Sequence, residues 1–266
     1  MTKSQAFRKP HRIRRKKNFL KNRFFWLTIL FLVIISGIFY LLFFHSFFQI
    51  KEIKILGNQK IQTSDLEKEI YPLIFKNFWK ISTKSIFLVN LGKTKNGLLQ
   101  NFPPIENIVL KRKFPDSLIL EIKERTSIGI FCQNQNCYLV DHLGIIFENS
   151  DGVSENFIKI KDTQQKPVPS LGEKVVDENI LDFALKVKTK LKEQLEIDAE
   201  EFTIISPERL NLKTSEGWEI YFDLKGDLTW QIEKLILLLE SEIPSEKRGN
   251  LEYIDLRFSR VYYKYR

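Results

Sequence analysis

The longest apolar stretch of the chain runs from Phe24 to Phe44 and contains 21 residues without a charge. A helical residue rises about 1.5 Å, so this stretch would extend roughly 30 Å, the thickness of one hydrocarbon core. The pattern therefore predicts a single membrane-spanning helix. A cleaved signal peptide is the main alternative, but its apolar region is shorter and a small-residue cleavage site follows it. Here HSFFQI follows, so we expect an uncleaved anchor.

The next apolar pattern, over residues 48–124, predicts a small domain of strands and helices. Alternation over 49–56 indicates a strand that ends at the turn Gly57-Asn58. Thr63-Ser64-Asp65 offers N-caps for a helix whose apolar positions are Leu66, Ile70 and Leu73. We expect a loop and then a second helix within 75–100, stopped by Pro103-Pro104.

A hairpin completes this domain. Ile108 and Leu110 lead into a turn at 114–117, where Pro115 presets φ at the first central position. The return strand alternates strictly, with apolar residues at Leu118, Leu120 and Ile122. The order strand, helix, helix, strand, strand predicts a three-stranded sheet with both helices on one face.

Residues 125–266 predict a second domain, a mixed antiparallel sheet with two packed helices. Strands are expected at 128–131, 138–140 and 145–147, and around the turn at Glu216-Gly217, whose flanking apolar residues are Leu210, Leu212, Trp218, Ile220 and Phe222. A loop is expected at 167–172. One helix is expected from an N-cap at Asp177 to about Leu195, with the apolar stripe Ile180, Ala184, Val187 and Leu191.

The second helix of this domain is expected after Asp227, with Leu228, Ile232, Leu235 and Leu239 on one face. Packing on the sheet is the favoured role of that face, and binding of a partner is the alternative. Asp141, beside the glycine of a turn, is interpreted as a turn former rather than a catalytic acid.

The chain ends in LEYIDLRFSRVYYKYR, whose alternation predicts a strand with Ile254, Leu256 and Phe258 in the core. The alternation changes phase at Ser259-Arg260, which indicates a bulge or bend before a terminal strand rich in tyrosine.

Charge is concentrated before the apolar run. Residues 1–23 hold ten Lys and Arg and no Asp or Glu, so the rest of this chain of net charge +9 carries −1. Basic residues beside a first membrane helix hold that side in the cytoplasm. We therefore expect a basic cytoplasmic tail (1–23), a transmembrane helix (24–44) and extracytoplasmic domains. The tail is expected to contact anionic lipid and not nucleic acid, although RIRRKK alone would suit phosphate contacts.

The two cysteines, Cys132 and Cys137, lie in CQNQNC. Outside the cytoplasm they can pair across a hairpin loop. A structural zinc site is not expected, because it needs four ligands and the chain has no second cysteine pair. The sequence leaves a disulfide and two free thiols equally open.

Several short motifs together resemble the FtsQ/DivIB family of bacterial cell-division proteins. The resemblance covers almost everything from about Phe48 to the C-terminus, although the family often has a proline soon after its Glu-Arg pair, where this chain has Thr126-Ser127-Ile128-Gly129. The motifs are Ile53-x-Ile55-x-Gly57-Asn58, Arg112-Lys113-Phe114-Pro115-Asp116-x-Leu118, Glu124-Arg125, Val140-Asp141-x-x-Gly144-x-Ile146-Phe147 and Tyr253-Ile254-Asp255-Leu256-Arg257-Phe258.

The resemblance implies an α+β protein with an N-terminal transmembrane helix, a POTRA domain over 48–124 (β-α-α-β-β) and a family-type β domain over 125–266. It implies a noncatalytic, single-pass scaffold of the cell (inner) membrane at the division septum. The partners implied are small bitopic division proteins of the FtsB, FtsL or DivIC type. Contacts of the POTRA domain with other early division proteins stay open.

Other function classes find less support in the residues. The three histidines, His11, His45 and His142, are far apart in the chain, and no phosphate loop, serine elbow or metal spacing is present. We expect no cofactor and no metal. A distant carboxylate pair of a cell-wall hydrolase stays open. An anchored POTRA-containing chaperone or secretion module is the alternative function.

The expected partner site is an exposed edge strand near the C-terminus. Such a strand has unpaired backbone groups that a partner strand can pair with, and Tyr and Arg are common hot-spot residues. The residues assigned to this site are Tyr253, Arg257, Arg260, Val261, Tyr262, Tyr263 and Tyr265.

Overall fold

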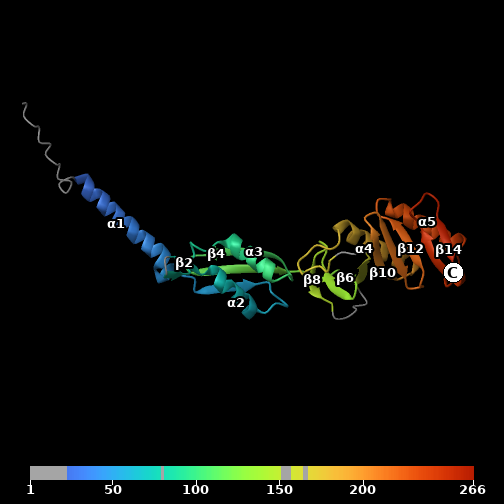
Figure 1. Cartoon of the computed structure of the whole chain (residues 1–266), viewed down its shortest axis with the longest axis horizontal. Helices are drawn as coiled ribbons and strands as arrows, with labels where there is room; N and C mark the ends of the chain where they lie inside the picture. Colours follow the sequence, from blue (N-terminus) through green and yellow to red (C-terminus); the bar gives the residue numbers. More distant parts are fainter. Residues whose placement is uncertain (1–22, 79–80, 151–156, 164–166) are drawn as a thin grey trace, which may run out of the picture.

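The structure is a computed structural model that describes residues 23–78, 81–150, 157–163 and 167–266. Figure 1 shows three parts arranged in a row: one long helix, a proximal domain (48–124) and a distal domain (125–266) with the C-terminus at the far end from the helix. The predicted basic tail lies, apart from Arg23, outside the described residues.

Helix α1 spans Arg23–Phe44 and corresponds to the predicted membrane segment. Its mean hydropathy is 2.7 and none of its residues is buried against the protein. Within the described ranges it is the one helix whose length and composition allow it to cross a membrane. A short 3-10 helix, η2 (Ser46–Phe48), connects it to the proximal domain.

The proximal domain has the predicted three-stranded sheet, in the order β1-β5-β4, with β1 parallel and β4 antiparallel to β5. Leu118, Leu120 and Ile122 alternate toward a core shared with α2 and α3. The two helices pack against each other, which places both on that one face of the sheet. The elements are β1 (Glu52–Leu56), α2 (Thr63–Ile74), β2 (Lys76–Phe78), β3 (Ile81–Thr83), α3 (Leu91–Asn101), β4 (Ile105–Lys113) and β5 (Ser117–Glu124).

Two local predictions in this domain are wrong. The N-cap of α2 is Gln62, without a side-chain cap bond, rather than a residue of 63–65. The Thr63 hydroxyl instead accepts a hydrogen bond from the Asn58 amide at 3.2 Å. The predicted loop before α3 contains a small hairpin, β2–β3. The prediction missed it because strands of three residues are too short to show a period of two.

The distal domain is built on a sheet that has nine strands in the described part of the chain, in the order β14-β13-β12-β11-β10-β9-β6-β7-β8. Its pairings are mixed, with β6–β9, β9–β10 and β12–β13 parallel. The elements are β6 (Gly129–Gln133), β7 (Asn136–Val140), β8 (Ile146–Asn149), β9 (Ile158–Asp162), α4 (Glu178–Leu195), β10 (Ala199–Ser206), β11 (Arg209–Thr214), β12 (Glu219–Asp223), α5 (Leu228–Ser241), α6 (Ser245–Arg248), β13 (Leu251–Asp255) and β14 (Tyr262–Tyr265).

The two long helices of this domain, α4 and α5, contact each other and cover the core side of the sheet. Trp218 and Phe222 are fully buried there, with Ile232 and Leu239 of α5. The apolar face of α5 therefore packs on the sheet, as the favoured interpretation predicted. Asp227 caps α5 by accepting hydrogen bonds from the backbone N–H groups of the first turn.

Helix α4 departs from prediction in detail. Asp177 occupies the N-cap position, but its side chain makes no cap hydrogen bond. Leu181 is fully buried, whereas Ile180 is only partly buried against the same core. Strands β9 and β10 had no counterpart in the prediction, and both lie in the middle of the sheet.

The junction between the two domains is held by Arg125. Its backbone N–H donates to the Pro104 carbonyl at 2.7 Å and its Nε to the Pro103 carbonyl at 3.0 Å. Its guanidinium also forms an ion pair with the buried carboxylate of Asp141. The other oxygen of Asp141 accepts the backbone N–H groups of Leu143 and Ile145, so Asp141 is a turn former, as predicted, and also a link between domains.

Candidate partner-binding edge

The last two strands form an antiparallel hairpin at the end of the sheet farthest from α1 (Figure 1). Asp255 pairs with Tyr262, and Leu251 pairs with Tyr265. Within the described ranges no strand pairs with the outer side of β14. The backbone groups on that side are therefore open to a further strand.

The tyrosines of β14 lie on both faces of this edge. Tyr262 is beside Asp255 on the face opposite the helices, and 55 % of its surface is exposed. Tyr263 and Tyr265 lie on the helix side, with ring centroids 5.8 Å apart. The Tyr263 hydroxyl donates to the Glu242 carboxylate at 3.1 Å, and this hydrogen bond raises the pKa of Tyr263.

Arg257 is fixed by a two-point ion pair with Asp255. Its Nε and Nη2 donate to the two carboxylate oxygens at 2.9 and 2.6 Å, and its backbone N–H donates to one of them at 3.1 Å. Burial would raise the pKa of Asp255, but the hydrogen bonds and charge of Arg257 hold that pKa below its ordinary value. Arg257 is thus a positioned cation at the start of the loop between β13 and β14.

A stack of two tyrosine rings lies next to Arg257, whose guanidinium is 5.9 Å from the centroid of Tyr221. Tyr253 stacks on Tyr221 of β12 with centroids 4.9 Å apart, and the Arg209 guanidinium lies over the Tyr221 ring, 4.3 Å from its centroid. Burial, and then the charge of Glu219, raises the pKa of Tyr221. Sequence reasoning found Tyr253 but missed Tyr221 and Arg209, because these two lie on β12 and β11, which the sheet pairing brings beside β13.

Phe258 is not a core residue, and the prediction that grouped it with Ile254 and Leu256 is wrong. Ile254 and Leu256 are buried, whereas Phe258 is 53 % exposed. Strand β13 ends at Asp255, and the chain then turns, so the period of two no longer determines where residue 258 points. Phe258 meets Tyr262 edge to face and, with Tyr253 and Asp255, lines a hollow beside β14.

The predicted bend is a complete reversal of the chain that includes Arg260 and Val261. Arg260 is exposed, and Val261 is partly buried against the core. Lys234 of α5 holds the start of the loop by donating to the carbonyls of Leu256 and Phe258 at 3.0 and 2.7 Å. Burial lowers the pKa of Lys234, and the charge of Asp255 partly opposes this. The structure thus groups Tyr253, Arg257 and Tyr262 on one face and leaves Arg260 on the loop.

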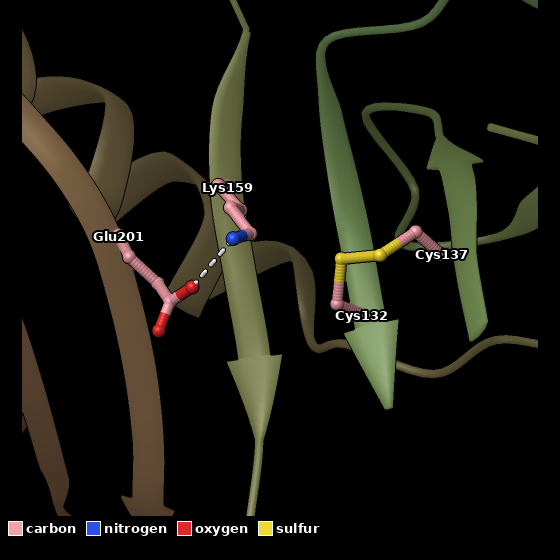
Figure 2. The surroundings of a disulfide bond; sticks show 4 residues. All are labelled: Cys132, Cys137, Lys159 and Glu201. Atoms are coloured by element: carbon pink, nitrogen blue, oxygen red, sulfur yellow. Dashed lines mark ion pairs between the residues drawn. A yellow bond between two sulfur atoms is a disulfide. The ribbon is translucent and has the colours of Figure 1, made fainter. Parts of the chain in front are cut away.

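The two cysteines lie elsewhere in the sheet. Figure 2 shows Cys132 on β6 joined to Cys137 on β7 by a disulfide, beside the cross-strand ion pair of Lys159 with Glu201 at 2.8 Å. The cysteines are directly opposite in the antiparallel register, with Cα atoms 4.2 Å apart. The bond closes a hairpin remote from β14.

The residues at the edge suit binding more than chemistry. Asp255 is neutralised by Arg257, and the Tyr263 hydroxyl is already hydrogen-bonded to Glu242. In the parts of the chain that the structure describes, no group of three His, Cys, Asp or Glu could hold a metal ion. What the edge offers is open backbone, aromatic rings on both faces and one oriented cation.

Comparison with known proteins shows that both domains are similar to known domain families. The family profile described as "Cell division protein FtsQ/DivIB, C-terminal" matches residues 130–257, and "POTRA domain, FtsQ-type" matches residues 48–125. Cell division protein DivIB of Clostridium tetani is 27 % identical over 233 residues, covering 85 % of this chain and 83 % of the relative. Cell division protein DivIB of Clostridium acetobutylicum is 28 % identical over 115 residues, 43 % of each chain.

A solved structure, POTRA1-2 of the periplasmic domain of Omp85 from Anabaena, covers 64 % of this chain and 95 % of its own at 12 % identity. Its TM-score is 0.22, which is too low to indicate a shared overall fold. The two profiles are consecutive and follow an apolar helix, in the arrangement that the sequence motifs predicted. Since the anchor, the POTRA domain and the C-terminal domain all agree with one family, the chain belongs to the FtsQ/DivIB family of cell-division proteins.

Proposed function

We propose that this cell-division protein is a noncatalytic scaffold that captures small bitopic division proteins of the FtsB, FtsL or DivIC type at the septum. The observation that carries the proposal is the open edge of β14. An extended segment of the partner adds to the sheet as a further strand, and main-chain hydrogen bonds supply affinity.

Specificity in this proposal comes from the side chains that flank the added strand. Tyr262 and Phe258 contact partner residues on one face, while Tyr263 and Tyr265 contact residues on the other. Aromatic side chains at an interface bring large contact area with few rotatable bonds. Arg257 supplies a cation whose position is fixed before binding, which favours an acidic partner residue near this end of the strand.

The topology that accompanies this function has the basic tail in the cytoplasm and both folded domains outside it. The ten basic residues of 1–23 support this orientation through the positive-inside rule. In the same proposal the POTRA domain meets other early division proteins, and the tail contacts anionic lipid rather than nucleic acid.

Photocrosslinking in cells tests the proposed partner. A photoreactive phenylalanine analogue replaces Tyr262, and the captured protein is identified by mass spectrometry. The matched control carries the same analogue at Tyr71, a 41 % exposed tyrosine on α2 of the proximal domain. Capture of a small single-span division protein from position 262 but not 71 supports the proposal. Capture of nascent secreted proteins would instead favour a chaperone.

The substitution Tyr262→Lys should weaken partner capture roughly tenfold or more, because truncating a central aromatic contact at an interface costs a large part of the binding energy. The fold should survive, since Tyr262 is exposed in a terminal strand. Tyr71→Lys is the matched control and should bind normally. Binding is measured by titrating the purified full chain in nanodiscs with the captured partner, and equal affinities for the two variants would contradict the assigned site.

A further inference from the structure

The C-terminal end of α1 is tied directly to the proximal domain. The Thr83 hydroxyl donates to the Phe43 carbonyl at 2.6 Å, and the Ser85 hydroxyl donates to the Leu42 carbonyl at 2.8 Å. The Gln49 side-chain amide adds a third hydrogen bond, to Phe43, at 3.0 Å. These carbonyls belong to the last turn of a helix, which has no partners for them within the helix.

Those hydrogen bonds determine where the domain sits relative to a bilayer. In a membrane-spanning helix the last turn lies at the boundary between hydrocarbon and headgroups, where unpaired carbonyls are costly. Thr83 is 3 % exposed and Ser85 is fully buried, so both hydroxyls are held in place by the surrounding domain. The surface around residues 83–85 is therefore brought to the same depth.

A row of phenylalanines lies on this end of the domain. It consists of Phe47, Phe48, Phe87 and Phe114, with successive ring centroids 5.0, 5.2 and 5.4 Å apart. Phe47 and Phe114 are more than half exposed, and Phe87 is 38 % exposed. The row begins three residues after α1 ends, so it continues the surface of the anchor onto the folded domain.

Two sets of contacts hold the row in place. Arg112 donates to the carbonyls of Ile86 and Val89 at 2.8 and 2.7 Å, which fixes the turn that carries Phe87. The backbone N–H of Lys51 donates to the Asp116 carbonyl at 2.8 Å, and the Lys51 ammonium meets the Asp116 carboxylate at 3.0 Å. The turn that carries Phe114 is thereby fastened to the residue just before β1.

Basic residues accompany the row. Lys84 lies between the two residues that bind α1, and Lys113 precedes Phe114. Aromatic rings and lysines together are typical of protein surfaces at the level of lipid headgroups, where rings enter the acyl boundary and ammonium groups reach phosphates. A protein partner would be a different occupant, but continuity with the anchor favours lipid.

We propose that the phenylalanine row is a membrane seat: its rings insert into the interfacial layer of the leaflet where α1 ends, and the lysines bind anionic headgroups there. The seat and the hydrogen bonds to α1 together fix the orientation of the POTRA domain relative to the bilayer surface. This inference is independent of partner capture at β14 and requires only that α1 is embedded in lipid.

Spin labelling of the full chain in nanodiscs of phosphatidylethanolamine and phosphatidylglycerol tests the seat. One nitroxide is attached at Phe114→Cys, at Val33→Cys in α1 or at Phe258→Cys on the distal domain, without reductant so that the native disulfide stays closed. The readout compares relaxation by molecular oxygen, which enters lipid, with relaxation by a water-soluble nickel chelate. All three replaced side chains are more than half exposed, so the fold should persist.

The label at Phe114 should be relaxed more by oxygen than by nickel, between the values at Val33 and Phe258. A value equal to that at Phe258 would overturn the proposal. Protection of the Phe114 label from nickel that appears only after an extract of membrane proteins is added would also overturn it, because a protein would then cover the row. A label at Val33 that is relaxed more by nickel than by oxygen would overturn it too, because α1 would then not be embedded in lipid. Phe87→Cys repeats the measurement in case Phe114→Cys does not fold, and should give the same result.

Discussion

The two edges of the large sheet have opposite surroundings. At one edge, β8 is covered by the segment 170–176 of the same chain: the Ile146 N–H donates to the Glu173 carbonyl at 3.1 Å, and the Gly172 N–H donates back to the Ile146 carbonyl at 2.7 Å. At the other edge, no described segment pairs with the outer side of β14. Ile146 is fully buried, whereas every residue of β14 is exposed.

The comparison shows that the protein covers one edge with its own chain and leaves the other open. Open edges favour aggregation, so natural sheets usually protect them with charges, bulges or covering segments. Here β14 carries Lys264 and a register shift opposite Leu251–Tyr253, which are modest protections. An edge left open at the point farthest from the anchor is expected where a partner strand is to be added.

The covered edge depends on Gly144, and Gly144→Ala should have the largest effect on stability. Gly144 has φ +79°, and a Cβ there would lie 1.8 Å from the Val176 carbonyl oxygen. The clash and the left-handed backbone should together cost about 2–4 kcal/mol of unfolding free energy. The measurement is urea unfolding of the full chain in detergent, followed by circular dichroism.

Gly249→Ala is the matched control for this prediction. A Cβ at Gly249 would meet no atom within 4 Å, and its φ of −60° suits any residue. Its unfolding free energy should stay within about 0.5 kcal/mol of the parent chain. Equal unfolding midpoints for the two alanine variants would show that the covering segment does not hold β8.

The open edge depends on the Asp255–Arg257 ion pair, and Asp255→Asn should have an intermediate effect. Asp255 is 6 % exposed and accepts three hydrogen bonds from Arg257. Loss of a buried, charge-assisted hydrogen-bond set should cost about 1–3 kcal/mol. Partner affinity should fall as well, because Arg257 loses its fixed position. If Asp255→Asn leaves both stability and partner affinity unchanged, the ion pair is not part of the binding site.

The same ion pair predicts a dependence on pH. The folded state lowers the pKa of Asp255 below its unfolded value of about 3.9, so the stabilisation is complete above that value and is lost as the pH falls through the folded pKa. The difference in unfolding free energy between the parent chain and Asp255→Asn should therefore shrink in acid. A difference that stays constant from pH 7 to roughly pH 2 would contradict this assignment.

Lys264→Met should have the smallest effect. The Lys264 ammonium meets Glu252 at 2.6 Å across the β13–β14 pair, and this hydrogen bond raises the pKa of Lys264. Both side chains are exposed, so water and salt screen the attraction. The unfolding midpoint should hardly change, while self-association measured by analytical ultracentrifugation should increase as the edge loses its charge. A large loss of stability would mean that this pair, and not the strand register, holds β14.

The elements that the sequence predicted are those with long, regular patterns. The anchor, the β4–β5 hairpin, α4 and α5 each show their period over many residues, and the structure has all four. The misses are of two kinds. Strands β2 and β3 are too short to show alternation, and β10, which forms a hairpin with the neighbouring β11, was also missed. Strand β9 became part of the sheet through parallel pairing with β6 and β10. Such pairing leaves little trace in local sequence.

The candidate site shows the same division. Tyr262, Tyr263, Tyr265 and Arg257 stood out as interface-type residues in one short stretch of sequence. Tyr221 and Arg209, which support Tyr253, could not be found, because they come from β12 and β11. Phe258 was assigned to the core because alternation was extended past the end of its strand.

By itself the sequence determined the membrane helix, the class of both domains and the tyrosine-rich last strand, because hydrophobic period and charge are written in consecutive residues. Only the tertiary structure decided the order of strands: β9 inserts between β6 and β10, β8 becomes a covered edge and β14 an open one. The physical reason is that strands pair through backbone N–H and C=O groups, which are the same whatever the side chain. Which edge remains unpaired therefore depends on how the whole chain packs around its core.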